Sequence, residues 1–146
     1  MQEERYTTKV TVGLILIKED RVLLIKRKNT GYMDGMYAFV AGHVEKGESL
    51  KQAMIRGANE EVGIKIDEND IEFVCLIRDG KRNDEYMNFY FKAYKYSGDI
   101  KIAEEDKCEE ITWTRIEDIP ENMIPNDLRA IQNMKNKIYL DEYNWK

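Results

Sequence analysis

One stretch of the chain limits its fold more than any other. Within residues 42–64 a glycine-bearing loop, an amphipathic segment and two adjacent carboxylates follow one another. Ser49 is suited to begin a helix because its side chain can accept a hydrogen bond from the first turn, and Gly63 is suited to end one. We therefore predict a helix from Ser49 to about Val62.

The polar residues of this predicted helix gather on one edge. At about 100° per residue, the edge holds Arg56, Gly57, Glu60 and Glu61, beside an apolar side of Leu50, Met54, Ile55, Ala58 and Val62. Adjacent carboxylates repel each other by a few tenths of a kcal/mol unless a cation compensates them. Because Mg²⁺ and Mn²⁺ prefer oxygen ligands, the pair Glu60 and Glu61 suggests a metal site, where a bare pair would be a solvated helix end.

The intervals between these residues decide between the two interpretations. They follow the signature G-x5-E-x7-R-E-U-x-E-E-x-G-U, in which U is a bulky aliphatic residue, at Gly42, Glu48, Arg56, Glu60, Glu61 and Gly63. At ordinary residue frequencies such a match is expected on the order of once in ten million starting points. One catalytic letter of the signature differs: at residue 57 glycine stands in the place of glutamate.

This signature is that of the Nudix, or MutT-like, hydrolases, and the chain resembles that family beyond it. The segment 31–39 before the loop, and Trp113 and residues 118–120 after it, are also similar. The resemblance implies an α/β fold, an α/β/α sandwich with a mixed β-sheet between helices, formed by residues 1–146 as a single domain. It also implies a diphosphohydrolase or pyrophosphatase. Water attacks phosphorus in a nucleoside diphosphate linked to another moiety, for which a nucleoside triphosphate is the expected example.

The resemblance assigns roles to the residues of the signature. The Gly42 carbonyl, Glu60 and Glu61 are expected to bind Mg²⁺ or Mn²⁺. Glu48 is expected to act around the metal or through bound water, and Arg56 to orient the carboxylates. Glu48, Arg56 and Glu60 are therefore the expected catalytic residues.

A further acidic metal ligand is expected from the segment 104–110. Glu105 is the preferred residue, with Glu104 and Glu109 as alternatives. A solvated acidic turn fits the same segment equally well.

Gly57 stands where well-studied relatives carry the general base. Three explanations are open: another carboxylate (Glu60, Asp84 or Glu85) takes the proton, activity is reduced or lost, or the substitution is deliberate. General-base assistance is worth about 10² to 10⁴ in rate, so turnover can persist without it. We favour a weakened or rerouted hydrolase. The alternative is a Nudix-fold protein that binds or senses a nucleotide without turnover.

Residues outside the signature are predicted to bind the substrate: Arg27 and His43 at phosphate, Phe39 and Phe89 by stacking on a base, and Glu85 at a base edge. Arg suits phosphate because its planar guanidinium donates two parallel hydrogen bonds. Residue type alone favours structural roles for several of them, as a charged strand end or as core aromatics of a sheet.

Charge and composition limit the other functions. A formal net charge of −5 argues against extended nucleic-acid contact, which needs a basic surface, so RNA-end processing is a weaker third hypothesis. The expected partner is a small nucleotide, and the resemblance leaves a homodimer open.

No apolar run approaches the ~20 residues of a membrane span, and the start lacks the order of a signal peptide. We therefore expect no membrane contact and a cytoplasmic location.

Cysteine and histidine usage narrows the chemistry further. Cys75 and Cys108 are far apart and neither belongs to a zinc-type spacing, so no disulfide framework is expected. His43 is the only histidine, which argues against a His-dependent nucleophile.

Strands are predicted around the motif by residue type and turn signals. They cover residues 10–17, 22–25, 37–40, 71–77, 87–96 and 111–113. A last helix is predicted to start near Pro125 and to carry Leu128, Ile131, Met134 and Ile138 at helical intervals. The pattern indicates a mixed sheet with a helix on each face.

Overall fold

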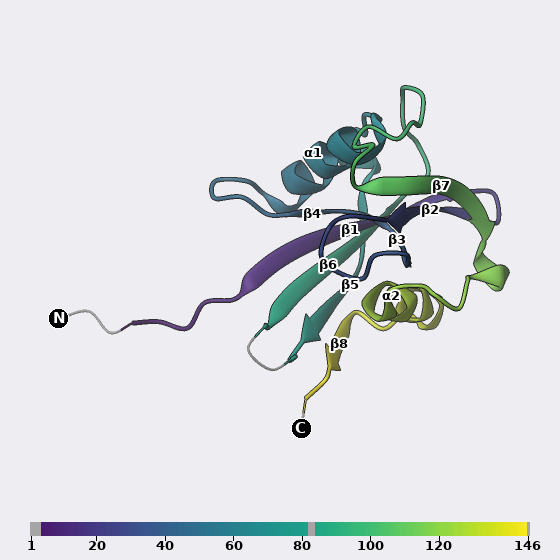
Figure 1. The fold of residues 1–146 in the computed structure, drawn as a ribbon. Coiled ribbons are helices and arrows are strands. Elements are labelled where there is room, and N and C mark those ends of the chain that lie inside the picture. The colour runs from purple at the N-terminus through teal and green to yellow at the C-terminus, as the bar shows by residue number, and fades with distance from the viewer. Residues whose placement is uncertain (1–3, 82–83, 146) are drawn as a thin grey trace.

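A computed structural model describes residues 4–81 and 84–145 of the chain, and Figure 1 shows its fold. The strands are β1 (Lys9–Lys18), β2 (Arg21–Arg27), β3 (Tyr37–Ala38), β4 (Val40–His43), β5 (Glu72–Asp79), β6 (Tyr86–Ala93), β7 (Cys108–Arg115) and β8 (Leu140–Tyr143). The helices are α1 (Leu50–Val62) and α2 (Pro125–Asn136), with short 3-10 helices at Glu68–Asp70 and Ile116–Asp118.

The strands form a mixed sheet in the order β3-β2-β1-β6-β5-β8, with β4 also paired to β1 and β7 to β2. The pairs β1–β6 and β5–β8 are parallel, and the others are antiparallel. Strand β1 changes its antiparallel partner along its length: residues 11–14 pair with β4, and residues 17–18 pair with β2. The first half of β1 therefore lies next to β4, and the last two residues of β1 lie next to β2.

Each face of the sheet is covered by one helix, α1 on one side and α2 on the other (Figure 1). Side chains alternate along β1, so Leu14 and Leu16 enter the core with α1, while Ile15 and Ile17 enter the core with α2. Burial of each such side chain stabilises the fold by about 1.5–3 kcal/mol. The predicted α/β/α sandwich with a mixed sheet is confirmed.

Helix α1 begins and ends as its sequence predicts. The Ser49 hydroxyl accepts a hydrogen bond from the Gln52 N–H at 3.1 Å, and the Gln52 side chain accepts one from the Ser49 N–H at 2.9 Å. Gly63 ends the helix in the left-handed conformation at φ 73°. These local interactions fix the helix that carries most of the signature.

The end of the chain differs from the prediction. Helix α2 starts at Pro125 but ends at Asn136, because Lys137 adopts φ 55° and its N–H bonds to the Asn133 carbonyl. Ile138 therefore lies outside the helix with 43% of its surface exposed, and its prediction as part of the helix was wrong. The chain continues instead as β8, which was not predicted and which pairs with β5.

Two smaller differences concern strand length. Strand β6 ends at Ala93 and not at Tyr96, and β7 extends on both sides of the predicted residues 111–113. Among the residues described, none of the helices is both long and apolar enough to cross a bilayer.

Candidate functional site

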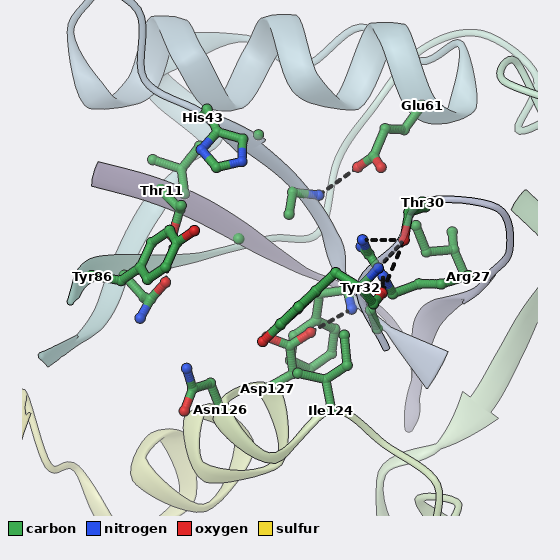
Figure 2. Close-up of a pocket in the computed structure, with 18 of the residues that line it drawn as sticks. Thr11, Arg27, Thr30, Tyr32, His43, Glu61, Tyr86, Ile124, Asn126 and Asp127 are labelled. Atoms are coloured by element: carbon green, nitrogen blue, oxygen red, sulfur yellow. Dashed lines mark hydrogen bonds between the residues drawn. The ribbon is translucent and has the colours of Figure 1, made fainter. Parts of the chain in front are cut away.

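A cavity of about 550 Å³ lies between the sheet, α1 and the start of α2. Figure 2 shows Glu61 reaching down from α1, Asn126 and Asp127 at the start of α2 on the opposite side, and Tyr32 on the loop between them. The cavity is therefore lined by residues that are far apart in the sequence.

The end of the cavity near α1 is acidic. Its lining includes Gly42, Glu61 and Glu104. The Ala41 N–H donates a hydrogen bond to Glu61 Oε1 at 2.6 Å. Burial raises the pKa of the Glu61 carboxyl to about 7, and the charge of Glu104 adds to this increase. The Glu61 carboxyl thus lies in a poorly solvated place close to Glu104, where a cation would relieve the repulsion between the two groups.

Arg56 ties the glycine loop to α1. Its Nε and Nη2 donate to the two Glu48 carboxylate oxygens at 2.8 and 2.9 Å, and Nη2 also donates to the His43 carbonyl at 2.7 Å. The paired guanidinium lowers the pKa of Glu48 to about 2. Arg56 therefore holds both ends of the loop that leads into the helix.

The adjacent pair Glu60 and Glu61 points in two directions. Glu60 accepts from Arg56 Nη1 at 3.2 Å with its side chain 53% exposed, and it does not line the cavity as Glu61 does. Over residues 4–81 and 84–145, the structure does not bring three or more His, Cys, Asp or Glu side chains into one group that could hold a metal ion.

Gly57 packs against strand β4. A Cβ atom built at residue 57 would lie 2.9 Å from the Ala41 carbonyl oxygen and 3.5 Å from Gly42 Cα. The 2.9 Å contact with a backbone oxygen could be relieved only if the helix or the strand moved. The glycine therefore has a packing role that helix propensity does not reveal.

The acidic segment after β6 contributes a residue to the cavity, namely Glu104. Its carbonyl accepts from the Lys107 and Cys108 N–H groups, which forms a turn. Glu105 is exposed and is not among the lining residues, while Glu109 pairs with Lys26 at 3.4 Å. The geometry favours Glu104 over Glu105 as the acidic side chain nearest Glu61.

Three of the predicted substrate residues line the cavity: Arg27, Phe39 and His43. Arg27 already bonds within the loop, since its Nε donates to the Tyr32 carbonyl at 2.9 Å and its Nη2 to the Thr30 hydroxyl at 3.0 Å. Phe39 is 1% exposed, so it forms a wall of the cavity and part of the core.

The other two predicted residues lie elsewhere. Phe89 packs in the core with α1, and Glu85 pairs with Arg78 at 3.3 Å; neither is among the cavity-lining residues. Strand alternation explains the position of Phe89, because the cavity face of β6 carries Tyr86, Asn88 and Tyr90.

Residues at the start of α2 were missed by the sequence reasoning. Asp127 is buried, and its oxygens accept from the Tyr90 hydroxyl at 2.6 Å and the Phe39 N–H at 3.0 Å. Burial raises the pKa of Asp127 to about 6. Asn126 also lines the cavity, and its Nδ2 donates to Asp79 Oδ2 at 2.9 Å. The sequence signal that could have identified Asn126 and Asp127 is their position as polar residues directly after Pro125, at the start of a helix.

Comparison with known proteins finds a matching family model and related chains. The family model described as the NUDIX domain matches residues 7–134. The Bacillus subtilis protein "Uncharacterized Nudix hydrolase YvcI" is 32% identical over 126 residues, which cover 84% of this chain and 75% of that protein. The NAD-capped RNA hydrolase NudC of Pseudomonas aeruginosa is 29% identical over 110 residues, 73% of this chain. The match spans 36% of the length of NudC.

Solved structures share the fold. The crystal structure of a MutT NUDIX hydrolase from Burkholderia pseudomallei gives a TM-score of 0.79 at 24% identity, covering 87% of this chain and 98% of that one. The NUDIX domain of Shewanella oneidensis NrtR, solved with ADP ribose, gives a TM-score of 0.72 at 19% identity, covering 92% and 90%. At these identities the likeness supports the fold alone.

Proposed function

Because the chain belongs to the Nudix family, we propose that it is a metal-dependent hydrolase that cleaves a nucleoside diphosphate linked to another moiety. The observation that carries the proposal is the layout of the cavity. Glu61 lies at one end, and Asn126 and Asp127 lie at the other (Figure 2). Gly42 also lines the cavity and packs against α1. A ligand with a charged diphosphate and a polar aromatic base matches this division.

The acidic end fits Mg²⁺ or Mn²⁺. These cations prefer oxygen donors, and the residues that line this end offer the buried Glu61 carboxyl, the Glu104 carboxyl and the backbone of Gly42. Glu61, the Gly42 carbonyl and Glu104 would hold the ion, and Glu60 would join them if its side chain turned away from Arg56. When bound, such an ion polarises phosphate oxygens and lowers the pKa of water.

The reaction we propose is the attack of water on phosphorus. The new oxygen–phosphorus bond forms as the anhydride P–O bond breaks, and the water proton passes to a carboxylate. Glu60 is our candidate for that carboxylate, with Asp84, which lines the cavity, as the alternative. Arg56 keeps Glu48 and the glycine loop in place, and Glu60 would reach the water once its side chain turned away from Arg56. Arg27 and His43 are proposed to contact phosphate.

The opposite end of the cavity suits a nucleobase. Tyr32 lines it with an aromatic ring, and Asn126 and Asp127 supply polar atoms. Most such sites combine apolar walls with a few polar groups that fix orientation. We therefore propose that the base lies toward α2 and the phosphates toward α1.

Gly57 supports a second candidate, a nucleotide sensor without turnover. No carboxylate can project from residue 57, and the helix packs tightly at this point. The NrtR domain solved with ADP ribose makes a related ligand class a reasonable choice for testing. In this alternative the cavity binds the nucleotide without hydrolysing it.

One experiment separates the two candidates. The protein is incubated with nucleoside triphosphates, ADP-ribose and NAD at several Mg²⁺ and Mn²⁺ concentrations, and products are measured beside calorimetric binding. We expect turnover that requires metal and that Glu61→Gln reduces at least tenfold, whereas Glu68→Gln, an exposed residue on the short 3-10 helix, leaves it unchanged. Binding without product under any metal selects the sensor. If neither binding nor product is observed, both candidates are rejected.

A further inference from the structure

Tyr32 lies on the loop between β2 and β3, at the end of the cavity proposed for the base. The residue lines the cavity and is 46% exposed, so a ligand can reach its ring. Figure 2 shows the side chain extending from the loop toward Asp127. Burial raises the pKa of the Tyr32 hydroxyl, and the charge of Asp127 adds to the increase, in agreement with this direction. The ring therefore stands opposite the polar atoms at the start of α2.

The loop that carries this ring has a backbone conformation that few residues tolerate. Positive φ angles occur at Asn29 (52°), Gly31 (81°), Met33 (49°) and Gly35 (84°). Glycine adopts this region freely and asparagine does so more often than most residues. Methionine has no such preference, and its side chain makes the conformation unfavourable. Other interactions must therefore hold the loop in this shape.

Arg27, the last residue of β2, supplies several of these interactions. Its Nε donates to the Tyr32 carbonyl at 2.9 Å and its Nη2 to the Thr30 hydroxyl at 3.0 Å. The guanidinium also lies over the Tyr32 ring, with Cζ 5.4 Å from the ring centroid. The Thr30 hydroxyl in turn accepts from the Tyr32 N–H at 3.1 Å and donates to Asp34 Oδ1 at 2.7 Å. One arginine thus contacts both the backbone and the ring of the same tyrosine.

These contacts use properties of arginine that a simple positive charge lacks. Two nitrogens of the planar group bond at a fixed spacing, and the group lies over an aromatic ring. Because Nε and Nη2 are used within the loop, the phosphate contact proposed above is left to Nη1. Binding of phosphate alone would not require the two bonds to the loop or the contact with the ring.

We propose that Arg27 is a positioning residue for Tyr32: it holds the loop 29–35 so that the ring stays where a nucleobase can stack on it. The inference rests on the proposed function, since it takes the ligand to contain a nucleobase. A change at Arg27 then weakens binding of the base through Tyr32, separately from any contact between Arg27 and phosphate.

The test measures the affinity for the base and for the phosphates separately. Dissociation constants are determined by calorimetry without metal, so that hydrolysis plays no part. The ligands are ATP, GTP, CTP and UTP, the nucleoside of the tightest of them, and inorganic triphosphate. Tyr32→Leu is expected to weaken the nucleotide and the nucleoside about fivefold or more, as the loss of a stacking contact, and to change inorganic triphosphate less than about twofold. Tyr139→Leu, at an exposed position that does not line the cavity, is the matched control.

Arg27→Lys keeps the charge and removes the paired geometry. We expect it to weaken the nucleoside about threefold or more in the wild type, and less than about 1.5-fold in a protein that already carries Tyr32→Leu. Two changes that act through one contact are not additive, and a general loss of stability would not produce this dependence on Tyr32. Any phosphate contact of Arg27 appears with inorganic triphosphate, to the same extent in both backgrounds. Arg21→Lys, at the exposed start of β2, is the matched control.

Thr30→Val loosens the same loop without changing residue 27. It removes the hydroxyl that bonds to Arg27, Tyr32 and Asp34, and it is expected to weaken the nucleoside while leaving inorganic triphosphate unchanged. If Arg27→Lys does not fold, this variant is combined with Tyr32→Leu in its place, and the same lack of additivity is expected.

Three results would overturn the inference. Arg27→Lys could weaken inorganic triphosphate and spare the nucleoside, its effect on the nucleoside could be equal with and without Tyr32, or Tyr32→Leu could leave nucleotide and nucleoside binding unchanged. The proposed hydrolase is tested independently, because these affinities are measured without turnover. The expected dependence on Tyr32 in a protein that hydrolyses no nucleotide rejects the hydrolase alone, whereas its absence in an active enzyme rejects this inference alone.

Discussion

The Cα atom of Gly57 faces the backbone of Ala41 so closely that a Cβ at residue 57 would stand 2.9 Å from the Ala41 carbonyl oxygen. The same strand residue donates its N–H to Glu61 at 2.6 Å, one helical turn further along α1. The close approach at Gly57 and the position of the Glu61 carboxylate therefore belong to one helix–strand contact.

Gly57→Ala should lower stability. In an exposed helix this change stabilises by about 1 kcal/mol, but here the added methyl meets backbone, and overpacking of this kind costs about 1–3 kcal/mol. We expect the free energy of unfolding, measured with urea, to fall by about 1 kcal/mol. Gln132→Ala, at an exposed position of α2, should change it by less than about 0.5 kcal/mol. A more stable Gly57→Ala protein contradicts the packing role.

Gly57→Glu should affect rate and stability in opposite directions. A carboxylate at this place would supply the missing base, worth about 10²-fold or more in kcat, while its Cβ strains the contact with Ala41. Gly57→Gln serves as the matched control, because it has the same size and no basic oxygen. We expect faster turnover only in the glutamate variant and a lower melting temperature in both. Equal kcat in wild type and Gly57→Glu would reject the missing-base hypothesis.

The sequence predicted α1 well because the information is local. Ser49 and Gly63 act within one turn of the helix ends, and the signature residues between them follow helical spacing. The reason for Gly57 was not accessible in the same way. The packing role of Gly57 depends on its contact with Ala41. No local sequence pattern shows how close the strand that carries Ala41 lies to the helix.

Glu104 and Glu105 should differ in their effect on metal affinity. Of these two residues, Glu104 lines the cavity with Glu61 and Glu105 does not. Glu104→Gln is therefore expected to weaken Mn²⁺ binding about tenfold or more, whereas Glu105→Gln is expected to weaken it less than about twofold. The affinity is measured by calorimetry or by the paramagnetic signal of free Mn²⁺. The reverse order would restore Glu105 as the ligand. Equal small effects would show that the segment is only a solvated turn.

Substrate-side residues were harder to predict than the signature. Phe89 fits a stacking role by type, yet alternation along β6 turns it toward the core with α1 and leaves Tyr86 facing the cavity. Asn126 carries no catalytic motif. It is held at the cavity by a hydrogen bond to Asp79 across 47 positions of sequence, and only the packing of α2 against β5 brings the two residues together.

Asp127 should make stability depend on pH. Its pKa is raised by burial from 3.8 to about 6, so the folded state binds the proton more tightly than the unfolded chain does. The resulting stabilisation is complete below about pH 4 and is lost as the pH rises through about 6. We expect wild type to lose up to about 3 kcal/mol relative to Asp127→Asn between pH 4 and pH 7. Urea titrations in metal-free buffer measure the difference, and a constant difference contradicts the prediction.

Arg56→Lys should separate charge from geometry at the glycine loop. Arginine reaches both Glu48 oxygens and the His43 carbonyl at once, whereas lysine carries the same charge as a single point and cannot form the paired contact. The loop that presents the Gly42 carbonyl would then be held less firmly. We expect kcat to fall about tenfold or more, since small displacements of positioned groups can cost about 10² in rate, with nucleotide affinity in the absence of metal nearly unchanged. Arg115→Lys, at an exposed pair with Asp20, is the matched control and should leave both quantities unchanged. If Arg56→Lys kept full activity, charge alone would account for Arg56, and the paired contact with Glu48 would have no part in positioning the metal ligands.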